Sequence, residues 1–257
     1  MTVLITELRK HIFIYLLFMK NCLISQMEYR VNFIFSCMVE LAYFAIKLTY
    51  VVVVYNLGVN IKGLSPDAIL LFVGSYTTMT GFFMMFFWQN FASLPENIAS
   101  GNLDMYIVKP VSMQFITTLR HVDVGFPIPN LVGGIVMTVL GWQRTGIEFN
   151  LKNISGFVLY MLTGICLSYS LFLLPQLLAF RTVKTGGLLE ISNALWDFNN
   201  MPMGIYNKFV QRVGTFILPL LLITNYSPLF VLGKLTVPSM IWGIAAPIIF
   251  TFITRLL

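Results

Sequence analysis

Residues 68–88 read AILLFVGSYTTMTGFFMMFFW, a run of 21 residues without a charged side chain. A helix of about 20 mostly apolar residues is long enough to cross the hydrocarbon core of a bilayer. Inside that core every backbone polar group must be satisfied within the protein, which a helix achieves by itself. The stretch therefore predicts a membrane-spanning helix.

Similar runs recur along the chain and predict an all-α integral membrane protein, one transmembrane domain over residues 1–257 with about six spanning helices. The six runs are Val31–Tyr55, Ala68–Trp88, Val122–Trp142, Ile154–Phe180, Val213–Leu232 and Val237–Leu257. Pro127 and Pro129 move the expected start of the third helix toward Ile128, because proline is tolerated in a first turn. Pro219 and the following NYSP at 225–228 favour a kink and a re-entrant turn in the fifth.

Composition excludes an ordinary soluble domain. Apolar residues make up 58% of the chain and charged residues only 10%, against roughly 25% charged in soluble proteins. The net charge of +6 comes from basic residues scattered at the ends of apolar runs, which indicates membrane orientation rather than nucleic-acid binding. The three cysteines are far apart, and His11 and His121 are isolated, so neither a disulfide framework nor a metal site is expected.

The first 30 residues differ from the runs that follow. His11–Cys22 mixes apolar residues with polar ones and is flanked by Arg9, Lys10 and Lys20. Such a segment is typical of an amphipathic helix that lies in the headgroup plane. A seventh span is the weaker alternative, because the uncharged run falls short of the roughly 17 residues usually required.

The basic residues also predict an orientation. With a cytoplasmic N-terminus, 11 basic residues fall on the inner side and 4 on the outer side, which follows the positive-inside rule. The inner set is Arg9, Lys10, Lys20, Arg30, Lys109, Arg120, Arg181, Lys184, Lys208, Arg212 and Arg255, and the outer set is Lys62, Arg144, Lys152 and Lys234. Both termini are therefore placed in the cytoplasm. The long inner loops, 89–121 and 181–212, then hold most polar residues, and we expect function to be driven from that side.

The first inner loop carries the most specific pattern. Ser93 with Glu96 three residues later predicts a capping box, and Gly101 is a suitable helix stop, so a two-turn helix is expected over Leu94–Ser100. The sequence GNLDMYIVKPV follows at 101–111. This string resembles the signature loop of ABC-2 type permeases. DFNNMPMGIY at 197–206 and TFILPL at 215–220 resemble further segments of that family, and the likeness extends over nearly the whole chain.

The resemblance implies a bacterial cell-membrane exporter in which two permease subunits, identical or different, sit on two cytoplasmic ATPase subunits. ATP and Mg²⁺ would bind to those ATPase subunits, and no cofactor is expected to bind to this chain. The chain has no phosphate-binding loop of the GxxxxGK[ST] type, and we do not expect it to be an enzyme. The family exports hydrophobic or amphipathic cargo such as drugs, antimicrobial compounds, peptides, pigments or lipids. By this resemblance the ATPase-coupling residues are Ser93, Leu94, Pro95, Glu96, Asn97, Ile98, Gly101, Leu103, Asp104, Lys109 and Pro110.

Polar and flexible residues inside the predicted spans are candidates for a substrate path, because intramembrane polar groups are costly and often functional. The candidates are Glu40, Lys47, Met84, Met85, Pro219 and Asn225. Pairing of Glu40 with a neighbouring helix, extension of Lys47 toward the interface and lipid contact of the methionines are the competing interpretations.

Two other classes of protein stay open. A secondary, ion-coupled transporter would need no ATPase but usually shows internal repeats, and none is evident between the two halves. A lipid-modifying membrane enzyme would need acids or histidines clustered at one membrane face, whereas Asp104, Asp123 and Asp197 are dispersed.

Overall fold

The computed structural model describes residues 2–58, 60–125, 127–181 and 186–256, and in this part of the chain it contains helices and no strand. The long helices are α1 (Thr2–Glu28), α2 (Arg30–Leu57), α3 (Pro66–Phe83), α7 (Ile128–Arg144), α8 (Leu151–Leu177) and α12 (Val237–Leu256). The shorter ones are η1 (Met84–Trp88), α4 (Gln89–Ala99), α5 (Asp104–Ile107), α6 (Met113–Leu119), η2 (Leu178–Phe180), α9 (Gly186–Asp197), η3 (Phe198–Asn200), η4 (Met203–Ile205), α10 (Lys208–Arg212), η5 (Val213–Ile217) and α11 (Leu220–Val231). Lys184 and Leu257, which the sequence predictions include, lie outside the described residues.

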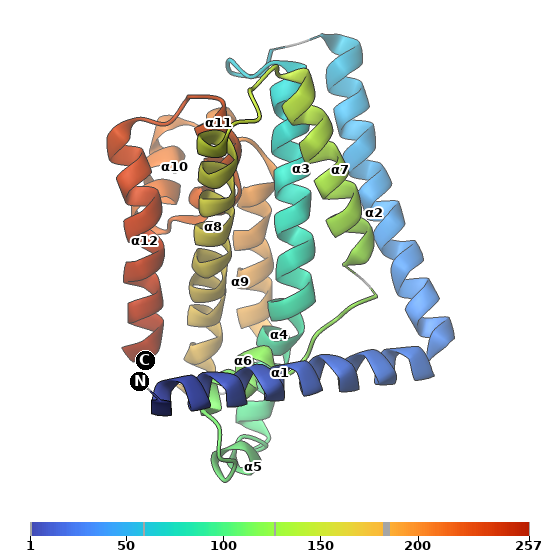
Figure 1. Ribbon diagram of the computed structural model, residues 1–257, viewed down its shortest axis with the longest axis vertical. Coiled ribbons are helices and arrows are strands. Elements are labelled where there is room, and N and C mark those ends of the chain that lie inside the picture. The colour runs from blue at the N-terminus through green and yellow to red at the C-terminus, as the bar shows by residue number, and fades with distance from the viewer. Residues whose placement is uncertain (1, 59, 126, 182–185, 257) are drawn as a thin grey trace.

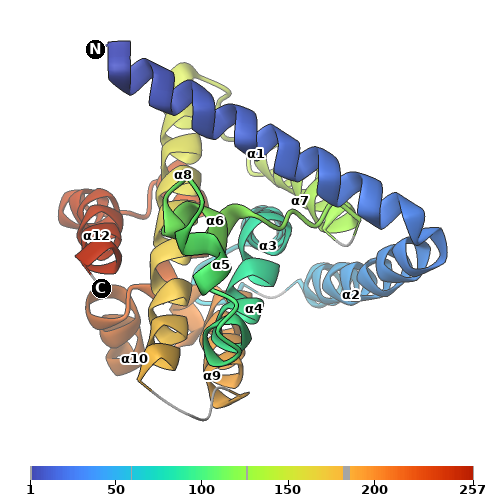
Figure 2. The ribbon, with the colours of Figure 1, turned by 90° about the horizontal axis from the view of Figure 1, so that it is seen from below.

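Helix α1 lies across one end of the bundle, crosswise to the long helices (Figures 1 and 2). It exposes large apolar side chains along its length, among them Ile12, Phe13 and Leu16. It is not among the helices that are long and apolar enough to cross a membrane. This is the arrangement that an interfacial helix over residues 1–30 requires.

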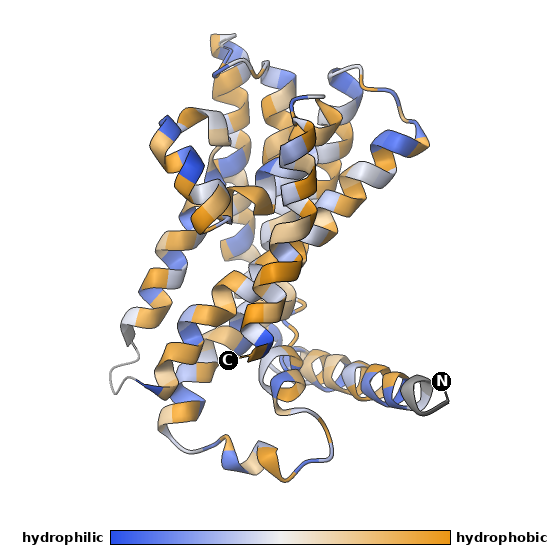
Figure 3. Cartoon of the chain, turned by 90° about the vertical axis from the view of Figure 1, so that its left-hand side faces the viewer, coloured by the Kyte–Doolittle hydropathy of each residue, from blue (hydrophilic) through white to orange (hydrophobic). Residues whose placement is uncertain are grey.

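Four helical segments are long and apolar enough to span a membrane, or five if the bent pair of α10–η5 with α11 is one span. The four are Arg30–Leu57, Pro66–Ala99, Leu151–Phe180 and Val237–Leu256. Apolar residues, shown in orange in Figure 3, make up most of the helical bundle. The third predicted span is α7, which begins at Ile128, after Pro127, and has only 17 residues. At 1.5 Å per residue it is about 25 Å long, short of a ~30 Å hydrocarbon core.

Helices α3 and α7 are in backbone contact along their length. A Cβ atom added at Gly134 would lie 2.5 Å from the backbone nitrogen of Thr78, and one added at Gly74 would lie 2.4 Å from that of Thr138. Small residues at such crossings let two helices approach more closely than larger side chains permit. The pair therefore forms a tightly packed unit.

The fifth predicted span, Val213–Leu232, does not form one straight helix. Between η5 and α11 the chain bends by 100° at Leu218 and Pro219. On one side of the bend, a Cβ atom at Gly204 would lie 3.3 Å from the Cβ atom of Lys62. On the other side, Lys234 Nζ donates to the carbonyl oxygen of Gly63. Both ends of the segment therefore meet the loop between α2 and α3, and α10, η5 and α11 form a re-entrant hairpin.

The second predicted inner loop, 181–212, is also not a simple loop. Helix α9 packs against the bundle with one face, where Trp196 stacks on Phe83 and Gln176 donates to Ser192 at 2.7 Å. The chain after it reaches the Lys62 end through Gly204. Burial of apolar residues such as Leu188 outweighs the polar composition that suggested a loop. Placing Lys208 and Arg212 with Lys62 changes the predicted split of basic residues from 11 against 4 to nine against six.

Candidate functional site

Buried aromatic residues hold α3, η1 and α4 in line. Phe83, Phe87 and Phe91 recur every four residues, with ring centroids 6.0 and 5.9 Å apart. Phe83 stacks on Trp196 with centroids 4.3 Å apart, and Phe87 contacts Tyr169 at 5.4 Å. Because these contacts continue through the π-helical turn η1, the segment Pro66–Ala99 stays one helix of 34 residues.

The predicted capping box at the start of a separate helix is wrong. Ser93 lies inside α4, which begins at Gln89, and its Oγ donates to the carbonyl oxygen of Asn90 at 3.1 Å. A capping serine would instead accept from a backbone N–H. Phe91 and Leu94 are buried and extend the apolar side of α3, so packing decides the helix boundary. The end of the helix was predicted correctly, because Gly101 follows with a φ of 72°.

The predicted coupling residues fall into two groups. Leu94, Pro95 and Leu103 are buried and anchor the segment, while Ser93, Asn97 and Ile98 are half-buried. The exposed members are Glu96, Gly101, Asp104, Lys109 and Pro110. The residues available to a partner are thus those near the turn after α4.

Helix α5 forms the tip of this region and lies beyond α1 at the same end of the bundle (Figure 1). Its apolar side chains are open to solvent, since Met105 is 62% exposed, Ile107 65% and Val108 83%. The sequence interpretation included these three residues in the segment Gly101–Pro110 but did not name them as coupling residues. The available signal was a group of apolar residues in a loop predicted to be polar. We refer to residues 96–108 as the tip.

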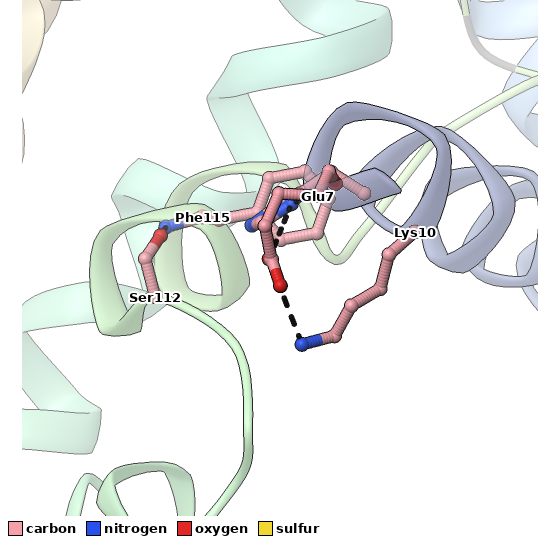
Figure 4. A network of polar contacts seen from close by, with 5 residues as sticks. Glu7, Lys10, Ser112 and Phe115 are labelled. Carbon is pink, nitrogen blue, oxygen red and sulfur yellow. Dashed lines mark hydrogen bonds and ion pairs between the residues drawn. The ribbon is translucent and has the colours of Figure 1, made fainter. Parts of the chain in front are cut away.

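The tip is connected to α1 through α6. The ring of His11 meets that of Phe115 edge-on, with centroids 5.0 Å apart. At the start of α6, Ser112 Oγ accepts from the backbone N–H of Phe115 (Figure 4). Farther along α1, Gln26 Nε2 donates to the carbonyl oxygen of Val122 at 3.0 Å. Its Oε1 accepts from the backbone of Val124 at 3.0 Å. Helix α6 and the chain that follows it are therefore attached to the interfacial helix.

A second candidate region is a polar network inside the bundle. Lys47 Nζ on α2 donates to Asn130 Oδ1 on α7 at 3.0 Å and lies 5.2 Å from the ring centroid of Tyr76. The Tyr76 hydroxyl donates to Asn200 Oδ1 of η3. Three helices and η3 are thus joined through side chains that a membrane core does not solvate.

The network continues into the re-entrant hairpin. Thr224 Oγ1 donates to the carbonyl oxygen of Asn199 at 3.3 Å, and Asn225 Oδ1 accepts from the backbone N–H of Met203 at 2.7 Å. The side-chain nitrogens of Asn130 and Asn199 are buried without a hydrogen-bond partner among the described residues. The network therefore contains two buried donors that no described residue pairs, which makes it a candidate functional region.

The predicted path residues lie in several places. Lys47 and Asn225 belong to the network just described. Glu40 is buried on α2, Met84 and Met85 are half-buried in η1, and Pro219 is buried at the bend of the hairpin. Among the described residues no three His, Cys, Asp or Glu side chains are grouped closely enough to hold a metal ion.

A model of the family described as "ABC-2 family transporter protein" matches residues 41–257. No curated protein and no solved structure shows significant similarity to the chain. The matched range begins within α2 and includes the tip, the polar network and the re-entrant hairpin, while α1 precedes it.

Proposed function

The chain belongs to the ABC-2 family of transporter proteins, and from this premise we propose that it is the permease subunit of an ATP-driven exporter. A multi-pass membrane protein of this family is a transport subunit, and a separate cytoplasmic ATPase would bind ATP and Mg²⁺. We place the protein in the cytoplasmic membrane of a bacterium, paired with a second permease, with the tip on the cytoplasmic side.

The observation that carries the proposal is the tip. Val108, Ile107 and Met105 expose apolar surface beyond the plane of α1, where the resemblance puts the ATPase contact. Exposed apolar residues ringed by polar ones are typical of protein interfaces. Glu96 and Asp104 are exposed on the same segment and supply charged groups at the rim of such a contact.

The connection between the tip and the rest of the bundle supports a mechanical role. The 34-residue helix Pro66–Ala99 ends at the tip and is about 50 Å long at 1.5 Å per residue. Its α3 part is in backbone contact with α7, so a tilt of the tip moves both helices together. Tyr76 on α3 then transmits the movement to Asn200 and the hairpin.

For the substrate we propose a hydrophobic or amphipathic molecule. The helices that border the network expose mostly apolar residues to the membrane, and the buried amides of Asn130 and Asn199 offer hydrogen bonds to a polar group. Such a combination suits a molecule that enters from the lipid with one polar end. Of the predicted path residues, we propose that Lys47 and Asn225 contact the substrate.

The test is co-purification of the tagged, full-length chain from its native host in mild detergent. We compare wild type with Val108→Glu, and use Leu151→Glu as the matched control because Leu151 is also 83% exposed but lies at the start of α8. An ATPase subunit should accompany wild type and Leu151→Glu and fall by at least about tenfold with Val108→Glu, as expected for the loss of a central interface contact.

Glu96→Arg, with Glu148→Arg in the loop before α8 as its control, extends the test to the charged rim. If equal amounts of the ATPase co-purify with wild type and all variants, the ATPase contact does not lie at the tip. If no ATPase accompanies wild type, an ion-coupled secondary transporter becomes the better proposal, followed by a lipid-modifying membrane enzyme.

A further inference from the structure

A large cavity lies between α1 and the chain on either side of α6. Its volume is about 690 Å³, which is within the roughly 300–1,000 Å³ typical of small-ligand sites. Ile14 and Phe18 of α1 form an apolar side, and Lys109, Arg120 and His121 line the opposite side. Helix α1 crosses the end of the bundle (Figure 2). A cavity that α1 lines is therefore at the depth expected of lipid headgroups.

The lysine and the arginine of the cavity converge on one aromatic ring. Lys109 Nζ lies 5.2 Å from the ring centroid of Tyr106, and the guanidinium carbon of Arg120 lies 5.3 Å from it. Arg120 Nη1 also donates to the Tyr106 hydroxyl at 2.6 Å. Neither cation has a carboxylate within 4.0 Å among the residues that the structure describes. Two like charges near one ring repel each other, and an anion bound between them would relieve that repulsion.

The other side chains that line the cavity leave an excess of basic over acidic groups there. Asp123 supplies its one carboxylate and has an interaction of its own. His121 and Cys22 are the other titratable side chains in the lining. The exposed Asn21 and Ser25 of α1 add neutral hydrogen-bonding groups on the same side as Phe18.

We propose that this cavity binds the headgroup of an anionic phospholipid, with its phosphodiester between Lys109 and Arg120 and its glycerol beside Ile14 and Phe18. Guanidinium and ammonium groups are the usual protein partners of phosphate oxygens. Basic pockets beside membrane helices commonly hold acidic headgroups. Inorganic phosphate offers the same oxygens but no apolar part, whereas a lipid fills both sides of the cavity and leaves its acyl chains along exposed Phe13 and Leu17.

A lipid bound here would join α1 to the base of the tip, because Arg120 follows α6 and Lys109 follows α5. The lipid composition around the protein would then affect the segment that we propose contacts the ATPase. Binding itself requires no ATPase, so its test stands apart from that of the proposed function.

The experiment measures lipid retention by the purified full-length chain in native mass spectrometry after detergent exchange. Equal amounts of phosphatidylglycerol and phosphatidylcholine are offered, with inorganic phosphate as a competitor. The variants are Lys109→Gln and Arg120→Gln, each with a charge-preserving partner, Lys109→Arg and Arg120→Lys. Lys152→Gln, at the start of α8, is the control for general charge loss.

We expect wild type to retain phosphatidylglycerol over phosphatidylcholine and each glutamine variant to lose about tenfold in retention, the equivalent of one charge-assisted hydrogen bond. The charge-preserving variants and Lys152→Gln should retain most of it. Equal retention of both lipids, or no difference between Lys109→Gln and Lys152→Gln, would overturn the proposal. Full displacement by millimolar inorganic phosphate would show an anion site and overturn the assignment to a lipid. Lys109 is exposed, so its variant keeps the test valid if Arg120→Gln does not fold.

Discussion

The π-helical segment η1 continues from α3 into α4 in one line, whereas η5 is followed by a 100° bend into α11. Both segments have five residues and both interrupt the regular hydrogen-bond pattern of a helix. Such interruptions are frequent at functional positions. The two outcomes differ, so the interruption alone does not decide whether a helix stays straight.

The difference lies in what surrounds each segment. Before and after η1, Phe83 and Phe91 are 1% and 2% exposed and pack on α8 and α9. In and after η5, Phe216 and Ile217 are 58% and 66% exposed, and Pro219 has no N–H with which to continue a helix. Packing therefore makes the first segment a rigid connection between the tip and the bundle, and its absence lets the second turn back.

The largest effect should come from removing the ring that holds the straight segment. We expect Phe83→Ala to lower the stability of the detergent-solubilised protein by about 3–5 kcal/mol, because a fully buried ring is replaced by a cavity. The matched variant in the bent segment is Phe216→Ala, whose ring is mostly exposed and contacts Trp242 at 5.8 Å. It should cost about 1 kcal/mol or less.

Reversible unfolding in mixed micelles, followed by tryptophan fluorescence, measures both changes. Similar losses for the two variants would mean that burial does not distinguish the segments, and the comparison would fail.

A smaller effect is expected where the straight segment meets α7. In Gly134→Ala the new Cβ atom would meet the backbone of α3 at Thr78, and since backbone cannot rotate away, the helices must separate. We expect a loss of about 1–3 kcal/mol, the usual cost of overpacking. Gly187→Ala in α9 is the control, because a Cβ atom there has no other atom within 4 Å. Unfolding in the same micelles would contradict this reasoning if Gly187→Ala were the more destabilising.

The sequence predicted features that depend on local composition. The helical class, the start of α7 after Pro127, the helix end at Gly101 and the break at Pro219 all follow from the chemistry of a few neighbouring residues. The family was also identified correctly from the string at 101–111 and its companions.

The rest depended on contacts between distant residues. Ser93 and Glu96 form a good capping pattern. However, Phe91 and Leu94 are buried against the bundle, and α4 therefore continues past Ser93 instead of beginning there. The return of the hairpin to the loop at Lys62 and Gly63 is determined by residues 204 and 234, far away in sequence. Likewise, the link from Lys47 to Asn225 passes through side chains on separate elements, which periodicity does not reveal.

The smallest expected change is at the bend itself. Pro219→Ala should cost only about 0.5–1 kcal/mol, chiefly because the unfolded chain gains freedom when proline is removed. Leu218 is already outside the helical region, with φ −117° and ψ 86°, so we expect the bend to persist without the proline. A distance measurement between spin labels at Phe209→Cys and Leu229→Cys tests this, with Cys22, Cys37 and Cys166 replaced by serine.

From a rise of 1.5 Å per residue, the two backbone positions are about 19 Å apart if the chain bends by 100°, and about 30 Å apart in a straight helix. We expect the shorter distance in wild type and a broader distribution around the same value in Pro219→Ala. A shift to the longer distance only in the variant would assign the bend to the proline rather than to the lack of packing around η5. The longer distance in wild type would make Val213–Leu232 a straight span, and the contrast with the segment through η1 would no longer hold.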